Sequence, residues 1–239
     1  MYGALTFQVS IWTLFNRMIY NGMYFFCKPL FKYDDNKLER ISSNIVSSIH
    51  GLRCVNCVVQ EIRNRDILFT YNPSVNYDSI IQFSIGYFIY DLLNDMRIKN
   101  LKLPFFIHHS MSIFTGLYLY SMGLTQLYLV ALFVELSNLN LNIKDIMDIL
   151  DLKHLQLYTI NGILFSLTFF VSRILYGPVA LRSAYILSNE IDPKNGLHNI
   201  PLILSTSFVT LNIYWFYKIV KIVIYKYHNY YKYHNYYKS

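Results

Sequence analysis

Two adjacent histidines and two acidic residues lie inside apolar stretches of this 239-residue sequence. His108 and His109 stand near the start of one stretch, and Asp91 and Glu135 lie in the stretches on either side. A histidine beside a buried carboxylate can act as a general base toward a hydroxyl or an amine. The same side chains can instead serve only as hydrogen-bonding contacts between helices. These four residues are therefore candidates for catalysis, and the sequence alone assigns catalysis to none of them.

Further polar residues within the apolar stretches suggest a shared polar interior. An ionisable group at membrane depth costs at least about 2.5 to 3.5 kcal/mol unless it finds a partner or water. Both charge signs are present, so the groups can neutralise one another inside a helix bundle. The residues expected to line such a pocket are His50, Asp91, His108, His109, Glu135, Asn138, Asn142, Asn161 and Arg173.

The sequence motifs do not indicate a metal site or a nucleotide-binding site. Cys54 and Cys57 form a CxxC with His50 one turn earlier, but a zinc site needs a further ligand or water. We expect these residues to pack between helices. The sequence contains no GxxxxGK[ST] motif for nucleotides, no GxSxG motif of serine hydrolases, no HExxH motif of zinc proteases and no EF-hand loop for calcium. The sequence therefore predicts no metal site and no cofactor.

Composition indicates that membrane-spanning helices position these residues. The chain is 54% hydrophobic and 18% aromatic, and its 15% of charged residues is well below the value of about 25% usual for soluble domains. Residues 103–134 and 200–217 contain no Asp, Glu, Lys or Arg. A helix of about 20 apolar residues crosses the hydrocarbon core of a bilayer. The fold class predicted is an all-α, polytopic transmembrane helix bundle.

About seven spans are expected, within a range of five to eight, and the second is the most polar. They are placed at residues 4–26, 41–59, 77–94, 103–120, 124–142, 156–176 and 200–217.

The distribution of Lys and Arg predicts the orientation of these spans. Connections 27–40, 95–102 and 143–155 and the segment from 218 hold 4 + 3 + 2 + 5 = 14 Lys or Arg, whereas the connections on the opposite side hold 2 + 0 + 2 = 4. The richer side is expected to be cytosolic, which places the C-terminus in the cytosol. The net charge of +7 is explained by this asymmetry, so no nucleic-acid partner is expected.

Several sequence motifs resemble the TLC domain of the TRAM, LAG1 and CLN8 superfamily, in order and spacing. They are SNIVSSIH (43–50), GYFIYDL (86–92), FFIHH (105–109), ELS (135–137) with Asn142 beyond it, and INGILFSLTFFVSRI (160–174). The resemblance is greatest to the branch once called transmembrane protein 56. It divides the chain into an N-terminal span and cytosolic loop (1–35), a TLC domain (36–224) and a Tyr/Lys/Asn/His-rich tail (225–239) with a repeated YKYHNY.

The resemblance implies lipid-related functions in the endoplasmic reticulum or a connected endomembrane. The superfamily includes ceramide synthases, in which a paired His is implicated in transferring an acyl chain from acyl-CoA to a sphingoid amine. His108 and His109 match that pair. The family's later HD and Asp pattern is not matched, because Glu135 and Asn138 stand in that region. Other branches are thought to bind, sense or regulate membrane lipids.

Two functions follow as hypotheses. The first is a multi-pass protein that binds or regulates membrane lipids, sphingolipid or phospholipid, through a polar pocket within the bundle and so contributes to lipid homeostasis. The alternative is an acyl-CoA-dependent N-acyltransferase of ceramide-synthase type, with acyl-CoA as substrate. A transporter is less favoured, because no internal symmetry is visible. The sequence leaves the oligomeric state open.

Overall fold

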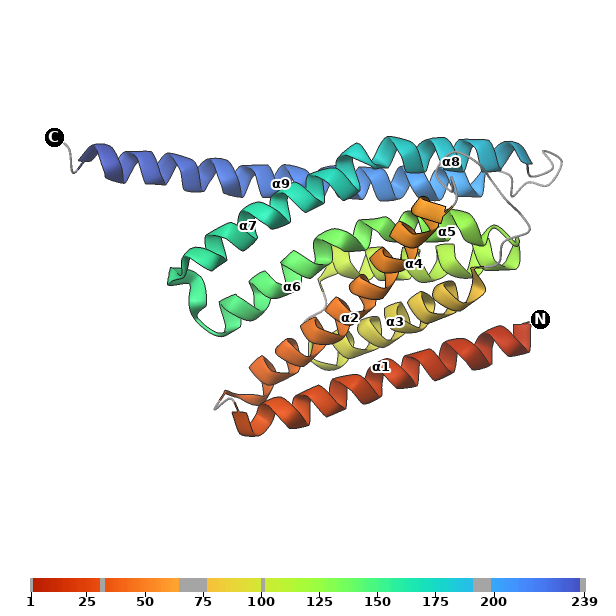
Figure 1. The fold of residues 1–239 in the computed structure, drawn as a ribbon, viewed down its shortest axis with the longest axis horizontal. Helices are drawn as coiled ribbons and strands as arrows, with labels where there is room; N and C mark the ends of the chain where they lie inside the picture. Colours follow the sequence, from red (N-terminus) through yellow and green to blue (C-terminus); the bar gives the residue numbers. More distant parts are fainter. Residues whose placement is uncertain (1, 31–32, 65–76, 100–101, 191–198, 237–239) are drawn as a thin grey trace.

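The computed structural model describes residues 2–30, 33–64, 77–99, 102–190 and 199–236, and every regular element within them is helical (Figure 1). The elements are α1 (Tyr2–Leu30), α2 (Asp35–Asn64), α3 (Asp78–Arg97), α4 (Leu103–Ser121), α5 (Thr125–Ala131), η1 (Leu132–Glu135), α6 (Leu136–Ile149), η2 (Leu152–His154), α7 (Gln156–Phe169), η3 (Phe170–Leu175), α8 (Gly177–Glu190) and α9 (Ile200–Tyr236). The predicted all-α fold is confirmed for this part of the chain.

These helices join into seven long segments. The short 3₁₀ element η1 connects α5 to α6 without a break in the chain direction, and the π-helical element η3 connects α7 to α8 in the same way. To within one residue at each end, the seven predicted stretches lie inside these seven segments. The helices extend further than the apolar stretches, because polar residues continue several of them; α9, for example, runs on to Tyr236.

Two stretches of helix are long and apolar enough to cross a bilayer by themselves. They are Gln156–Ile186, which comprises α7, η3 and most of α8, and Ile200–Tyr225 in α9. The other segments mix polar and apolar residues; α2, for example, opens with the sequence DNKLER. The number of crossings therefore stays a prediction for the remaining five segments.

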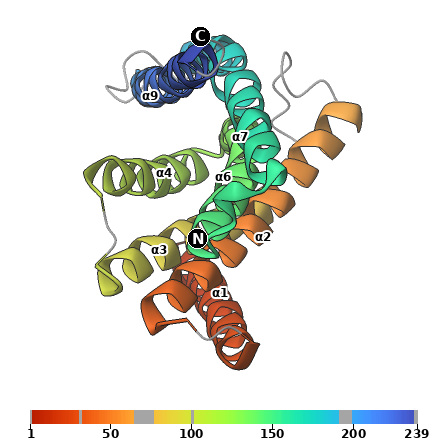
Figure 2. The same ribbon diagram turned by 90° about the vertical axis from the view of Figure 1, so that its left-hand side faces the viewer.

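Six of the seven segments form a closed ring. Around it, α2 contacts α3, α3 contacts α4, α4 contacts α9, α9 contacts η3 and α8, α7 contacts α6, and α6 contacts α2. Figure 2 shows this arrangement nearly end-on, with α1 at the bottom of the view beside α2 and α3. The helix α1 therefore lies outside the ring and packs against its wall.

Close packing of α1 on α3 depends on one glycine. A Cβ atom at Gly86 would lie 2.6 Å from the Cβ of Trp12 and 3.0 Å from the backbone nitrogen of Thr13. The hydroxyl of Thr13 donates a hydrogen bond to the backbone oxygen of Gly86 at 3.2 Å. Because glycine has no side chain, the two backbones can approach this closely.

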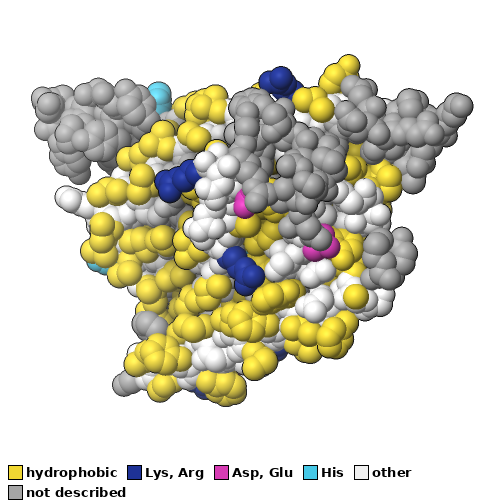
Figure 3. Space-filling view, turned by 45° about the vertical axis from the view of Figure 1, so that its right-hand side comes forward, with side chains coloured by type: hydrophobic (Ala, Val, Ile, Leu, Met, Phe, Trp, Pro, Cys, Tyr) yellow, Lys and Arg dark blue, Asp and Glu magenta, His cyan; other side chains and the backbone are white. Residues whose placement is uncertain are grey.

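The outer surface carries many large apolar side chains. On α1, Phe7 is 64% exposed and Met18 is 70% exposed, and α4, α7 and α9 present similar residues. On the face in Figure 3, the side chains that are coloured by type are mostly apolar, and few of them are charged. Contiguous exposed apolar surface of this kind is typical of contact with lipid or another protein. Polar residues, in contrast, gather inside the ring.

Candidate functional site

A large cavity lies inside the ring, and all six ring segments contribute to its wall. Its volume is about 670 Å³. Representative lining residues, in chain order from α2 to α9, are Ser43, Asp91, His109, Asn142, Phe169 and Trp215. The cavity extends to the end of the ring at which α3 ends and α4 begins, where Ile98 and Lys102 line it. We call this space the larger cavity.

A smaller cavity adjoins the larger one toward the opposite end of the ring. Its volume is about 80 Å³, and its lining is mostly apolar, with Leu127 and Leu204 among its residues. Three residues line both spaces, namely Phe88, His108 and Arg173. The interior therefore changes from polar to apolar along the ring, and these three residues mark the boundary.

The histidine pair occupies the α4 part of this wall. His108 packs against α9, with its ring 5.4 Å from that of Trp215 and 5.7 Å from that of Phe208. His109 faces α3, where its Nε2 lies 3.4 Å from a carboxylate oxygen of Asp91. The helix thus directs the two imidazoles to different neighbours, as the angle of about 100° between successive residues requires.

Arg173 is buried at the boundary and held by three neutral acceptors. Its Nε donates to the hydroxyl of Ser137 at 2.8 Å, and its two terminal nitrogens donate to the amide oxygens of Asn138 at 2.8 Å and Asn212 at 3.0 Å. Among the described residues, no carboxylate therefore lies within ion-pair distance of the Arg173 guanidinium. A buried guanidinium in this state is a suitable partner for an anionic group.

Arg173 reaches the cavity from an irregular turn. It lies in the π-helical element Phe170–Leu175, which interrupts the long segment between α7 and α8. A π-helical turn contains one residue more than an α-helical turn and is frequent at functional sites. Nothing in the sequence predicted it.

Glu135, which lines the smaller cavity, pairs with His50, which lies behind it. The Nδ1 of His50 lies 3.5 Å from a carboxylate oxygen of Glu135, and its Nε2 is 3.2 Å from the hydroxyl of Ser84. The imidazole stacks on Tyr87 with 3.8 Å between ring centroids. Glu135 also accepts a hydrogen bond from Asn138 at 2.8 Å, which connects this pair to Arg173.

The wall opposite the histidines is held together by polar contacts between α2 and α6. Arg40 donates to Asp145 at 2.6 Å, and the amide of Asn44 donates to the same carboxylate at 2.7 Å. One turn further along, Asn142 donates to the hydroxyl of Ser48 at 3.2 Å. Asp145 in this wall is thus paired with an arginine, unlike Asp91 and Asp95 on α3.

The structure brings most of the predicted pocket residues together. The larger cavity is lined by Asp91, His108, His109, Asn138, Asn142 and Arg173, and the smaller one by His108, Glu135 and Arg173. His50 and Asn161 line neither cavity: His50 is fully buried against Glu135, and Asn161 donates to the backbone oxygen of Asn140 at 2.9 Å.

Several lining residues were not predicted. Asp95 and Lys102 fell in a predicted connection, because they lie just beyond the ends of apolar stretches. The spacing of Asp95 four residues after Asp91, on one face of a helix, was the available signal. Asn212 and Trp215 were also missed: Asn212 offered the same signal as Asn138, an amide within an apolar stretch, whereas an indole in such a stretch does not indicate a polar site.

Fold and site together define a helical protein with an apolar exterior and a polar chamber enclosed by a ring of six segments. The chain matches the family model of the TLC domain, named for TRAM, LAG1 and CLN8, over residues 38–221. It belongs to the TLC domain family. No curated protein matches the chain.

Membership of this family supports the broader predictions made from the sequence. The TLC domain and the two long apolar helices identify a membrane protein, and the family is associated with lipid metabolism or sensing. The resemblance to the superfamily is confirmed.

Proposed function

We propose that this protein binds a membrane lipid inside the helix ring, with the headgroup in the larger cavity and an acyl chain in the smaller one. The observation that supports this is the junction of the two cavities at Phe88, His108 and Arg173. A polar space that leads into an apolar one has the polarity pattern of an amphipathic molecule. Exclusion of acyl surface from water favours binding of the apolar end.

The polar lining suits a charged headgroup. Arg173 is buried beside three neutral acceptors, and a planar guanidinium recognises phosphate well. Amide and hydroxyl side chains elsewhere in the wall, such as Asn142 and Ser43, offer hydrogen bonds to hydroxyl or amine groups. A phospholipid or a sphingolipid has these groups.

All seven segments cross the membrane in this proposal, and the larger cavity opens on the cytosolic side. Its open end is where the 95–102 connection and the C-terminal half of α9 lie, and these belong to the Lys- and Arg-rich group of connections. We place the protein in the endoplasmic reticulum or a related endomembrane, in the branch once called transmembrane protein 56, with a role in lipid homeostasis.

Filling the smaller cavity tests the proposal. Ala131 lines this cavity, so Ala131→Trp should block an acyl chain, whereas Ala4→Trp places the same indole on the exposed side of α1. Each protein is purified in detergent, and co-purified lipid is extracted and quantified by mass spectrometry per mole of protein. Wild type and Ala4→Trp should retain lipid, and Ala131→Trp should lose most of it.

Gel filtration and thermal unfolding establish that each variant is folded before lipid is compared. Equal lipid in folded Ala131→Trp and Ala4→Trp would contradict the placement of the acyl chain. Absence of lipid from wild type, after purification in a mild detergent, would contradict the function.

The second candidate is acyl transfer of the ceramide-synthase type. The observation that favours it is the ion-pair distance of 3.4 Å between His109 and Asp91, beside His108 in one cavity wall. A histidine oriented by a carboxylate can accept a proton from an attacking amine. The amine nitrogen would then bond to the acyl carbonyl carbon, and the thiol of coenzyme A would leave.

A microsomal assay separates the two functions. Membranes containing the protein are incubated with radiolabelled acyl-CoA of several chain lengths and a sphingoid base. Formation of N-acyl product above a vector control, lost in His109→Ala, would establish the transferase. Lipid retention without any product would leave binding as the function.

A further inference from the structure

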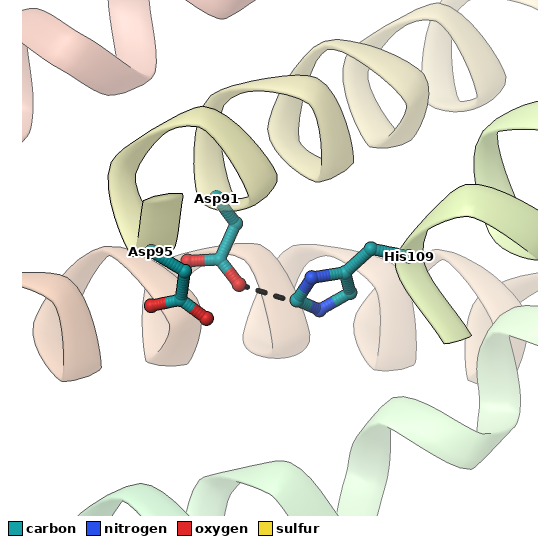
Figure 4. Close-up of side chains that lie close together, drawn as sticks. All are labelled: Asp91, Asp95 and His109. Carbon is teal, nitrogen blue, oxygen red and sulfur yellow. Dashed lines mark ion pairs between the residues drawn. The ribbon is translucent and has the colours of Figure 1, made fainter. Parts of the chain in front are cut away.

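Three potential metal ligands meet on the wall of the larger cavity between α3 and α4. Asp91 and Asp95 lie one turn apart on α3, and His109 approaches them from α4 (Figure 4). One ligand atom from each of the three lies within 4.8 Å of the others. In Figure 4 both carboxylates and the imidazole point into the same small space. We refer to these residues as the α3–α4 cluster.

No Lys or Arg of the described chain forms an ion pair with the two carboxylates of this cluster. Asp91 accepts a hydrogen bond of 3.4 Å from Ser43 and has His109 as its ion-pair partner. Within the described chain no Lys or Arg is at ion-pair distance from Asp91 or Asp95, although Lys102 lines the same cavity. Two neighbouring carboxylates in a partly buried wall favour either a shared proton or a bound cation.

His109 makes a cation the better match. The side chain is only 7% exposed, and its Nδ1 has no hydrogen-bond partner among the described residues. Its Nε2 is 3.4 Å from the Asp91 oxygen. Ligand atoms bound to one tetrahedral ion at about 2.1 Å are themselves about 3.4 Å apart. This pair of atoms therefore already has the separation that a shared ion requires.

We propose that Asp91, Asp95 and His109 bind one divalent transition-metal ion whose open coordination positions face the larger cavity. Three protein ligands with an open position are the pattern of metal sites that act on a bound molecule rather than only holding the fold together. One imidazole and two carboxylates suit Zn²⁺, Mn²⁺ or Fe²⁺. Ca²⁺ prefers six to eight oxygen ligands, so it fits the cluster less well.

The position of the ion specifies what it would contact. Its open positions point toward the space assigned to the lipid headgroup, where a phosphate or hydroxyl oxygen can complete the coordination shell. That last step rests on the proposed function, whereas the ion site itself rests on the cluster. An entry path is available from the end of the cavity lined by Ile98 and Lys102.

Metal binding is measured on the full-length protein with Zn²⁺ as the probe, and a parallel dialysis of wild type uses Mn²⁺. Protein purified in detergent without a histidine tag is stripped with a chelator and dialysed against graded concentrations of Zn²⁺, and bound metal is determined by mass spectrometry. Wild type should bind one equivalent that is sensitive to the cluster. Asp95→Asn and His109→Ala should each weaken this binding by at least about tenfold.

Asp148→Asn is the matched control. It removes one carboxylate from the end of α6, where Asp148 pairs with Lys144 outside both cavities. The control should bind Zn²⁺ as wild type does. The histidines of the C-terminal segment are present in every variant, so any contribution from them is constant.

The outcomes separate the ion from the lipid. Equal Zn²⁺ binding by wild type, Asp95→Asn and folded His109→Ala would overturn the metal site, as would failure of wild type to bind Zn²⁺ and, in a parallel dialysis, Mn²⁺. Lipid is quantified in the same samples. If wild type holds lipid but shows no Zn²⁺ binding at the cluster, the metal site is overturned and the proposed function stands. If wild type binds Zn²⁺ at the cluster but holds no lipid, the proposed function is overturned and the metal site stands.

Discussion

His108 and His109 are neighbours in sequence but have different chemical surroundings. His108 lies at the boundary of the two cavities among aromatic rings of α9, and His109 faces the acidic residues of α3. A nitrogen of His109 that binds a metal ion cannot also accept a proton from a substrate. Under the metal proposal, His108 is therefore the base available to any acyl transfer.

Arg173 should matter for stability as well as for binding. Arg173→Leu removes three hydrogen bonds and leaves the oxygens of Asn138 and Asn212 without this donor. We expect the free energy of unfolding to fall by about 2 to 5 kcal/mol, since buried hydrogen bonds in membrane proteins contribute about 0.6 kcal/mol each on average and about 1.7 kcal/mol at most.

Unfolding in mixed micelles, followed by circular dichroism, measures this loss. Lys221→Leu on the exposed face of α9 is the control and should change stability little. Equal stability of the two variants would show that the hydrogen bonds of Arg173 contribute little.

At the scale of the elements, α1 and α3 pack closely at Gly86. In Gly86→Ala the new methyl group would lie 2.6 Å from the Cβ of Trp12, so α1 must move away from α3. We expect a loss of about 1 to 3 kcal/mol in the free energy of unfolding.

Gly162→Ala is the matched control for this substitution. A Cβ at Gly162 meets no atom within 4 Å, and the residue lies inside α7. Because alanine favours helix more than glycine does, this variant should be as stable as wild type or more stable by up to about 1 kcal/mol. Thermal unfolding in detergent compares the two. Similar melting temperatures would contradict the packing argument.

The π-helical element provides a further prediction at this scale. Deleting Val171, whose side chain is exposed, removes the extra residue and should convert Phe170–Leu175 into a regular α-helix. Counted from α7, Arg173 would then take the place that Ser172 has now, on a different side of the helix, so Arg173 would lose its contacts with α6 and α9. Lipid retention and thermal stability should both fall. Unchanged values for both would show that the π turn does not position Arg173.

The elements themselves could largely be predicted from the sequence, whereas the site could be predicted only in part. Seven stretches were recognisable because burial in a bilayer requires long apolar runs, and these runs fall inside the observed segments. Asp95 was missed because such a run ends before it. The pairing of Glu135 with His50, and of Arg173 with Asn212, depends on which helices meet across the ring, and no local pattern encodes that.

At the scale of the whole molecule, the ring shows how much of the C-terminal segment forms the wall of the larger cavity. The last residue of α9 that lines the larger cavity is Ile222, and the repeated hexapeptide begins after it, at Tyr225. A chain ending at Tyr225 should therefore retain wild-type amounts of lipid. A chain ending at Phe216 lacks Lys218 and Ile222 from the wall and should lose lipid. Lipid analysis of both truncated proteins tests this, and loss of lipid from the longer one would assign a role to the repeat.

Among the described residues, the lining of the larger cavity reaches one end of the ring, past Ile98 and Ile222, whereas the narrow apolar space lies toward the other. A molecule that enters by the wide end is drawn from the monolayer on that side. Under the proposed function, the two monolayers of the membrane are then not equivalent for this protein. Its occupancy would follow the composition of one leaflet and be insensitive to changes confined to the other.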